Sequence, residues 1–175
     1  MVRIVNSKER RERILKKLLV TKEPKKGQEL GEEMGVTRQV IVKDIAILRA
    51  EGHNIIATPD GYIIASAQPN KVKRIIAVCH NAGQMEDELR TIVKYGATVE
   101  DVIVEHPLYG EMRGMLMIKT LKDVESFVER FYKDNAQPLS RLTDGVHMHT
   151  VVADSQEVID NLLKELKEKG MLACD

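Results

Sequence analysis

The sequence predicts an α+β protein in which an N-terminal winged helix-turn-helix precedes an α+β sandwich. Two observations predict this class. Residues 1–66 carry three helix signals and then a short β-hairpin signal, whereas strand and helix signals alternate over residues 70–175. The segment SAQPN, from Ser66 to Asn70, is polar and contains a proline, as is typical of a linker. We therefore expect two domains, 1–66 and 70–175, each long enough to bury a core.

Three helices are expected in the first domain. Ser7 can cap a helix over residues 8–20. The apolar stripe of this helix has four members: Ile14, Leu15, Leu18 and Leu19. A shorter helix is expected over 27–34, and Thr37 can cap a third, longer helix. A short helix, a glycine-containing turn and a longer helix together indicate a helix-turn-helix.

A wing is expected after the third helix. Two β-runs, NIIAT and YIIA, flank the turn residues Pro59, Asp60 and Gly61, which predicts a hairpin. The charge is distributed unevenly along the chain. Residues 1–66 hold 13 Lys and Arg against 9 Asp and Glu, whereas residues 67–175 hold 14 against 18. The positive first domain suits a polyanion, although an excess of this size is mild support.

The third helix is expected to be the recognition helix. At about 100° per residue, three apolar residues share one face and should be buried: Ile41, Ile45 and Leu48. The residues expected to contact DNA are Thr37, Arg38, Gln39 and Lys43. Long polar side chains in the N-terminal half of such a helix can reach base edges in the major groove. The alternative is a solvated helix face, and the surrounding helix-turn-helix and wing favour DNA binding.

The second domain is expected to be a mainly antiparallel sheet with helices on one side. The expected strands are 72–79, 99–105, 111–119 and 145–152. The expected helices are 84–95, 122–133 and 155–169. The first strand, which ends at Cys79, reads as a buried strand, and Cys79 is expected to be a buried free thiol.

Four residues of the second domain suggest a metal site. His147 and His149 alternate along a strand and therefore point to the same face, and His80 directly follows another strand. Glu88 lies on the inward stripe of a helix, where a carboxylate is costly unless it is paired or binds an ion. Three imidazoles and a carboxylate suit one divalent transition metal per chain, with Ni²⁺ or Zn²⁺ favoured and Fe²⁺ or Co²⁺ also compatible. Surface histidines or hydrogen-bonded core histidines are the alternative.

The segment HPLYG carries two further candidates. His106 and Tyr109 lie in a tight connection between two strands, near the expected rim of the domain. They can line a ligand pocket, and His106 can equally well cap the turn.

Two stretches resemble known families. VTRQVIVKDIAILRAEGHNIIATPDGYII resembles the winged helix of biotin-repressor-type bacterial regulators, and AVCH, Glu88, EHPLYG and PLSRLTDGVHMHTV resemble the 3H domain. Together they resemble the niacin-responsive repressors of NAD biosynthesis over nearly the whole chain. The resemblance implies DNA binding, nicotinic acid as co-repressor, and a metal held by four residues: His80, Glu88, His147 and His149.

We therefore expect a homodimeric transcriptional repressor that binds double-stranded operator DNA and is not an enzyme. One recognition helix reads only a half-site, which is the reason to expect a dimer. The alternatives are a regulator for which the metal itself is the signal and a metal-dependent hydrolase. No second general base, nucleophile elbow or phosphate loop supports the hydrolase. Without a signal peptide or an apolar run of about 20 residues, a cytoplasmic protein with no membrane partner is expected.

Overall fold

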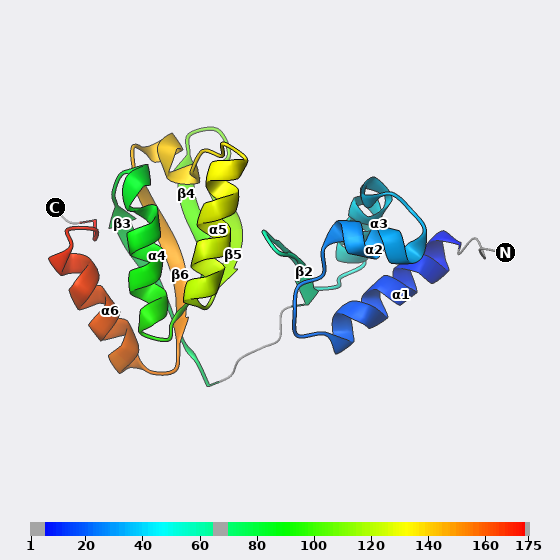
Figure 1. The fold of residues 1–175 in the computed structure, drawn as a ribbon, viewed down its shortest axis with the longest axis horizontal. Coiled ribbons are helices and arrows are strands. Elements are labelled where there is room, and N and C mark those ends of the chain that lie inside the picture. Colours follow the sequence, from blue (N-terminus) through cyan, green and yellow to red (C-terminus); the bar gives the residue numbers. More distant parts are fainter. Residues whose placement is uncertain (1–5, 65–69, 174–175) are drawn as a thin grey trace. The chain divides into compact units, whose positions relative to one another are not determined.

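The computed structural model describes residues 6–64 and 70–173, which fall into two compact units, Met1–Ala67 and Gln68–Asp175 (Figure 1). Most of the expected linker, residues 66–69, lies outside the described residues. The fold class is the expected α+β class: helices and a hairpin in the N-terminal unit, helices and an antiparallel sheet in the C-terminal unit.

The N-terminal unit is a winged helix-turn-helix. Its helices are α1 (Ser7–Val20), α2 (Gly27–Met34) and α3 (Arg38–Ala50), and the wing is the antiparallel pair β1 (Ile55–Thr58) and β2 (Gly61–Ile64). The core has seven buried members: Ile14, Leu18, Leu30, Ile41, Ile45, Leu48 and Ile55. The three residues predicted for the inward face of α3 are among them.

Two details of α1 differ from the prediction. Its N-cap is Asn6, whose Oδ1 accepts the backbone N–H of Glu9 at 2.8 Å, whereas Ser7 is the first helical residue. A cap must stand before the first turn with its backbone extended, and Asn6 meets both conditions. Leu19 is 63% exposed, because Ile14 and Leu18 already fill the contact of α1 with the core. The Thr37 cap of α3 is as predicted, with Oγ1 accepting from Val40.

The wing is held against the start of α2 by its backbone. Lys25 and Tyr62 exchange two backbone hydrogen bonds of 2.9 Å each. Gly61 has φ +131°, and a Cβ there would lie 2.4 Å from the carbonyl oxygen of Lys25. The turn therefore requires glycine at this position both for its conformation and for the close approach of the two backbones.

Helix α3 is also fixed by a buried ion pair that the sequence pattern does not reveal. Asp44 is 2% exposed, and its carboxylate accepts from Nε of Arg10 at 2.6 Å, with Arg11 at 3.7 Å. The apolar periodicity of α3 marks the inward stripe but gives no sign that an arginine of α1 meets it there. The pair holds α1 against the helix that carries the expected DNA contacts.

We expect Asp44→Asn to lower the free energy of unfolding of the winged helix by about 1–3 kcal/mol, because Arg10 loses a charged hydrogen-bond partner. Chemical denaturation followed by circular dichroism measures this. The control is Glu12→Gln on the exposed side of α1, for which a change within about 0.5 kcal/mol is expected. Equal effects of the two substitutions would contradict the structural role of the pair.

The C-terminal unit is a four-stranded antiparallel sheet in the order β3-β6-β4-β5. The strands are β3 (Val72–Cys79), β4 (Thr98–His106), β5 (Gly110–Ile118) and β6 (Val146–Ala153). Helices α4 (Met85–Lys94), α5 (Leu121–Lys133) and α6 (Gln156–Glu168) pack on one face of it (Figure 1). Two short 3-10 helices, η1 (Ala82–Gln84) and η2 (Leu139–Thr143), precede α4 and β6.

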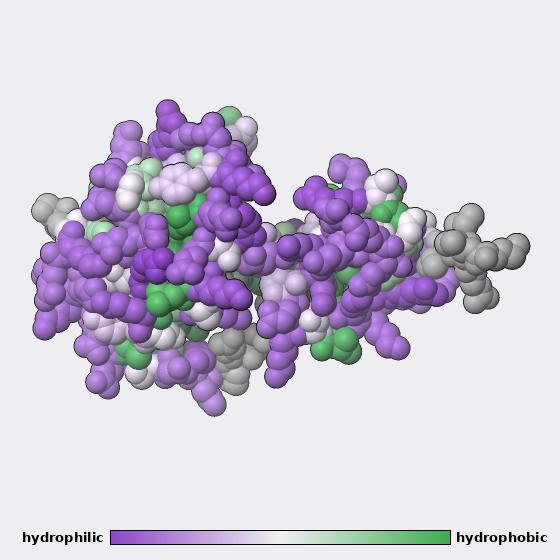
Figure 2. Space-filling model, viewed as in Figure 1, coloured by the Kyte–Doolittle hydropathy of each residue, from purple (hydrophilic) through white to green (hydrophobic). Residues whose placement is uncertain are grey.

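The core of this unit lies between the sheet and the three helices. It includes Leu89 and Ile92 of α4, Val124 of α5, and Ile159 and Leu162 of α6. The outward surfaces of the same helices are mostly hydrophilic, as Figure 2 shows for the face drawn in Figure 1. The apolar residues of each helix therefore lie on the side that faces the sheet.

The prediction of a buried first strand was wrong. β3 is an edge strand, and within it only Ile76 and Val78 are buried. Ile75 is 56% exposed and Cys79 is an exposed free cysteine. An apolar run shows that a strand is favoured, but its place in the sheet depends on partners far away in sequence.

Candidate metal centre and DNA-binding surface

The buried carboxylate of Glu88 contacts the imidazoles of His80, His147 and His149. Oε2 lies 2.6 Å from Nε2 of His80 and 3.5 Å from Nε2 of His147, and Oε1 lies 3.2 Å from Nε2 of His149. All four side chains are at most 4% exposed. The structure thus brings together the four residues that the sequence singled out.

Local structure places each of these side chains. His147 and His149 share the helix-facing side of β6, opposite Val78 and Ile76 of β3. His80 follows the last residue of β3. Glu88 lies in the first turn of α4, on the same inward stripe as Ile92.

The short helix η1, which leads directly into α4, begins with a capping box. Oδ1 of Asn81 accepts from the backbone of Gly83, and Oε1 of Gln84 accepts from the backbone of Asn81. The reciprocal bonds set the direction in which the chain turns from β3 into α4. They therefore fix His80 and Glu88 relative to each other.

Each imidazole is oriented through its second nitrogen. The Nδ1 atoms of His80, His147 and His149 lie 2.8, 2.9 and 2.6 Å from the backbone carbonyl oxygens of Asn81, Gly145 and Asp101. In the neutral ring, donation by Nδ1–H to a carbonyl oxygen fixes the tautomer, so that Nε2 carries no proton and can bind a metal. All three Nε2 atoms face Glu88. Metal-binding histidines are commonly held in this way, with one ring nitrogen bonded to an outer partner such as a backbone carbonyl and the other turned toward the metal.

The electrostatics of the cluster are dominated by its burial. Burial by itself would raise the pKa of Glu88, but the three imidazoles, His149 foremost, lower it well below its ordinary value. Burial would likewise lower the pKa of His80 and of His149, yet the Glu88 carboxylate raises both above 6.5. The site thus holds a carboxylate that stays ionised, and the imidazoles of His80 and His149 bind protons more tightly than usual.

A metal ion fits this arrangement. Among the described residues, Glu88 Oε1 and His149 Nε2 are the buried side-chain atoms without a hydrogen-bond partner, although they lie 3.2 Å apart. Unpaired buried polar atoms are costly, and a cation bound to both would remove the cost. One ligand atom each from His80, Glu88 and His147 also lie within 4.8 Å of one another. Three imidazoles and a carboxylate are the donor set of a divalent transition metal.

Two supporting features were missed by sequence reasoning. Asp101 is 1% exposed, and its carboxylate accepts from the backbone of Thr150 and from Arg113 while its carbonyl oxygen orients His149. Gly145 has φ +95°, and a Cβ there would lie 2.6 Å from the carbonyl oxygen of His80. The signals available in the sequence were an acidic residue, Asp101, within an apolar strand and a glycine, Gly145, two residues before His147.

The expected DNA contacts lie on the surface of the N-terminal unit. Thr37, Arg38, Gln39 and Lys43 are all exposed, at the N-cap and on the first turns of α3. Ala46, on the same side, is exposed too. This is the end of a recognition helix that normally approaches base edges.

His106 and Tyr109 lie in the β4–β5 hairpin and outside the histidine cluster. Nδ1 of His106 accepts from the backbone N–H groups of Leu108 and Tyr109, so the histidine caps the turn. The two rings are stacked with centroids 5.0 Å apart, and Tyr109 is 70% exposed. The hydrogen bonds of His106 thus agree with the alternative that this residue caps the turn. A role of His106 and Tyr109 in ligand binding stays a prediction.

Together these features define a class: a winged helix-turn-helix protein with a second domain that carries a candidate metal centre. Residues 10–63 match the model of an HTH domain, and residues 73–175 match that of the 3H domain. In the described part of the chain, every helix is too short or too polar to cross a membrane.

Two curated relatives match nearly the whole chain. A protein of Thermotoga maritima named "Probable transcription repressor NiaR" is 43% identical over 164 residues, which cover 94% of this chain and 93% of the relative. "Transcription repressor NadR" of Bacillus subtilis is 42% identical over 169 residues, which cover 95% and 94%. An uncharacterized protein of Methanothermus fervidus is 34% identical over 104 residues, 55% of this chain and 16% of that protein.

The chain belongs to the family of 3H-domain transcription repressors that includes NiaR and NadR. It is accordingly a helix-turn-helix transcription repressor and not an enzyme. The alternative of a metal-dependent hydrolase is therefore excluded.

Metal binding should stabilise the protein more as the pH rises. The raised pKa values of His80 and His149 mean that imidazolium–Glu88 attraction stabilises the metal-free fold fully below pH 6.5 and is lost as the pH rises through those values. Protons also compete with the metal in the lower range. We expect the difference in Tm between Ni²⁺-loaded and metal-free protein to grow between about pH 6 and about pH 8.

The matched variants are Glu88→Gln and, on the outer side of the same helix, Glu86→Gln. Loss of an outer partner of a metal ligand already weakens binding by about 10- to 100-fold, so Glu88→Gln should cost at least as much. Isothermal titration with Ni²⁺ and Zn²⁺ measures this. Unchanged affinity in Glu88→Gln, or a Tm difference that shrinks with pH, would contradict the assignment.

Proposed function

We propose that this protein is a homodimeric repressor of NAD-biosynthesis or niacin-uptake genes, with nicotinic acid as co-repressor and one divalent metal bound in the C-terminal unit. The observation that carries the proposal is one chain with two sites: an exposed recognition-helix face and a buried cluster of three histidines around Glu88. Its membership of a repressor family agrees with this reading. A cytoplasmic location follows from the proposed role.

The proposed DNA contacts divide into two kinds. Gln39 and Arg38 are suited to base edges, Gln for adenine and Arg for guanine or a phosphate. Lys43, one turn further along α3, and the hydroxyl of Thr37 at the N-cap are suited to phosphates. A single α3 covers only a half-site, so a second copy is proposed to occupy the other half of a two-fold operator.

The proposed metal is Ni²⁺ or Zn²⁺, with Fe²⁺ and Co²⁺ as other candidates that the donor set accepts. His80, Glu88, His147 and His149 would hold it. When bound, the ion supplies a positive charge that neutralises the buried carboxylate and links α4 to β6. A rigid link between these elements would keep the C-terminal unit in one arrangement.

Nicotinate is proposed to favour the dimer geometry that matches the operator. A ligand can shift such an equilibrium only by its difference in affinity for the two states. His106 and Tyr109, stacked at the β4–β5 hairpin, stay candidates for contact with the ligand. A second candidate function is a regulator for which the metal is the signal; the unpaired atoms of Glu88 and His149 support a bound metal in both candidate functions alike.

Fluorescence anisotropy with labelled DNA from upstream of niacin-uptake or NAD-biosynthesis genes tests the proposal. At fixed salt, nicotinate should tighten binding of the metal-loaded protein, and His106→Ala tests the hairpin candidate in the same assay. DNA affinity that ignores nicotinate but responds to the metal would favour the second candidate. Specific binding that responds to neither would overturn the effector part of the proposal.

Variants of α3 separate base contacts from phosphate contacts. Gln39→Ala should cost about 1–3 kcal/mol and relax the preference at one base pair, whereas Lys43→Ala should weaken all sequences alike and reduce the slope of log affinity against log salt by about 1. Lys122→Ala, an exposed lysine of the C-terminal unit, is the control. If Lys43→Ala and Lys122→Ala behave alike, Lys43 does not contact the phosphates.

A further inference from the structure

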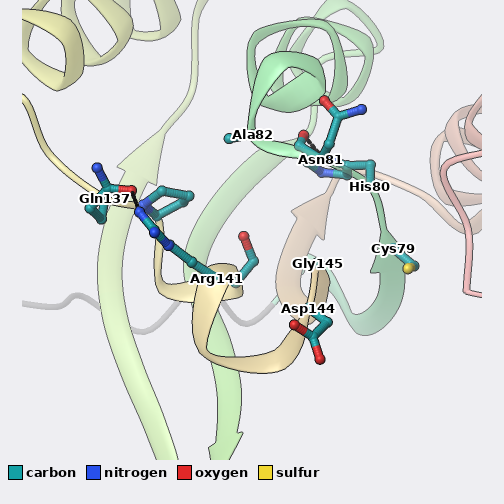
Figure 3. A pocket seen from close by; sticks show the side chains of 10 residues that line it. Cys79, His80, Asn81, Ala82, Gln137, Arg141, Asp144 and Gly145 are labelled. Atoms are coloured by element: carbon teal, nitrogen blue, oxygen red, sulfur yellow. Dashed lines mark hydrogen bonds between the residues drawn. The ribbon is translucent and has the colours of Figure 1, made fainter.

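A cleft of about 560 Å³ opens beside the histidine cluster (Figure 3). Its walls come from two connections: the turn from β3 into α4 and the segment that leads through η2 into β6. The lining residues are Cys79, His80, Asn81, Ala82, Gln137, Pro138, Ser140, Arg141, Asp144 and Gly145. The volume is in the range of pockets that hold small molecules. His106 and Tyr109 are not among its walls.

The chemistry of the walls suits a small carboxylate. Arg141 is the one permanently positive side chain among the lining residues, and Asp144 is the one negative side chain. The Nη1 atom of Arg141 donates to Oε1 of Gln137 at 2.5 Å, and Figure 3 shows this pair across the cleft from His80 and Asn81. A guanidinium presents a planar fork of donors that matches a carboxylate with two parallel bonds. Amide and hydroxyl groups of Asn81 and Ser140 supply the neutral partners that a heteroaromatic ring nitrogen needs.

The cleft and the histidine cluster share parts of the backbone. His80 lines the cleft and holds Glu88 through Nε2, while its Nδ1 bonds the carbonyl oxygen of Asn81, another lining residue. On the opposite wall, the carbonyl oxygen of Gly145 accepts from the backbone N–H of His80 and also orients His147. A ligand that bridges the two walls would therefore fix the segments that carry the imidazoles.

We propose that this cleft is the effector site and that Arg141 binds the carboxylate of the effector, with Asn81 and Ser140 facing its ring. The inference rests on the proposed function, because it takes nicotinate as the effector. It moves the ligand away from the His106–Tyr109 hairpin and into direct contact with the backbone that holds His80 and His147. Metal and effector then act on the same two chain segments without sharing a side chain other than His80.

Isothermal titration of full-length, metal-loaded protein with nicotinate tests the cleft, with nicotinamide and benzoate as companion probes. Because a hydrogen bond to a charged group is worth about 1.5–3 kcal/mol, Arg141→Ala should weaken nicotinate binding by about 10- to 100-fold. Arg141→Lys should lose less. Arg74→Ala, an exposed arginine of β3, should bind like the wild type. Metal content and circular dichroism show whether each variant is folded and loaded.

The preference for nicotinate over nicotinamide shows whether Arg141 contacts the ligand or has only a structural role. Nicotinamide lacks the carboxylate, so the wild type should prefer nicotinate strongly, and Arg141→Ala should remove most of this preference. Nicotinate binding that is equally strong in Arg141→Ala and in the wild type would overturn the cleft while leaving the proposed function intact, and a loss in His106→Ala instead would place the ligand at the hairpin. A wild type that binds no nicotinate would overturn the effector identity and the cleft together, while specific operator binding would still mark a repressor.

Discussion

The C-terminal unit depends on one buried negative charge. Glu88 is 1% exposed, and an ionised carboxylate at that depth costs several kcal/mol unless positive or hydrogen-bonding groups surround it. The three imidazoles provide that surrounding, and they come from the end of β3 and from β6. Helix α4 therefore packs against the sheet with Glu88 at the point where these histidines converge. The same convergence places one ligand atom each of His80, Glu88 and His147 within 4.8 Å of one another, which makes the cluster a candidate metal site.

The histidines themselves are fixed by the backbone. Each Nδ1 lies against a carbonyl oxygen from a different turn or strand, so the orientation of the rings is part of the fold. Asp101 makes this possible at His149, because its carboxylate is held by Arg113 and by the backbone of Thr150 while its carbonyl accepts from the ring. A site built in this way needs little rearrangement to receive an ion. The raised pKa values of His80 and His149 also mean that protons bound to these rings can neutralise part of the charge of Glu88.

The proposed effector cleft and the histidine cluster share parts of the same backbone. Gly145 accepts the N–H of His80 and orients His147, and the close approach of its Cα to the His80 carbonyl oxygen leaves no room for a side chain. Coupling between two ligands needs an element whose arrangement both of them bias. We propose that the turn from β3 into α4 and the turn from η2 into β6 would carry such a coupling, because both line the proposed cleft and both hold residues of the histidine cluster.

The sequence by itself determined the elements and the candidate ligands. Apolar periodicity and caps predict helices and strands to within a few residues, because they report local contacts. Alternation along β6 and the inward stripe of α4 single out His147, His149 and Glu88 for the same reason. The tertiary structure decided what depends on partners distant in the chain: the edge position of β3, which exposes Ile75 and Cys79, and the bonds of buried Asp44 and Asp101. It also made the cleft beside Arg141, because a cavity exists only between segments that folding brings together.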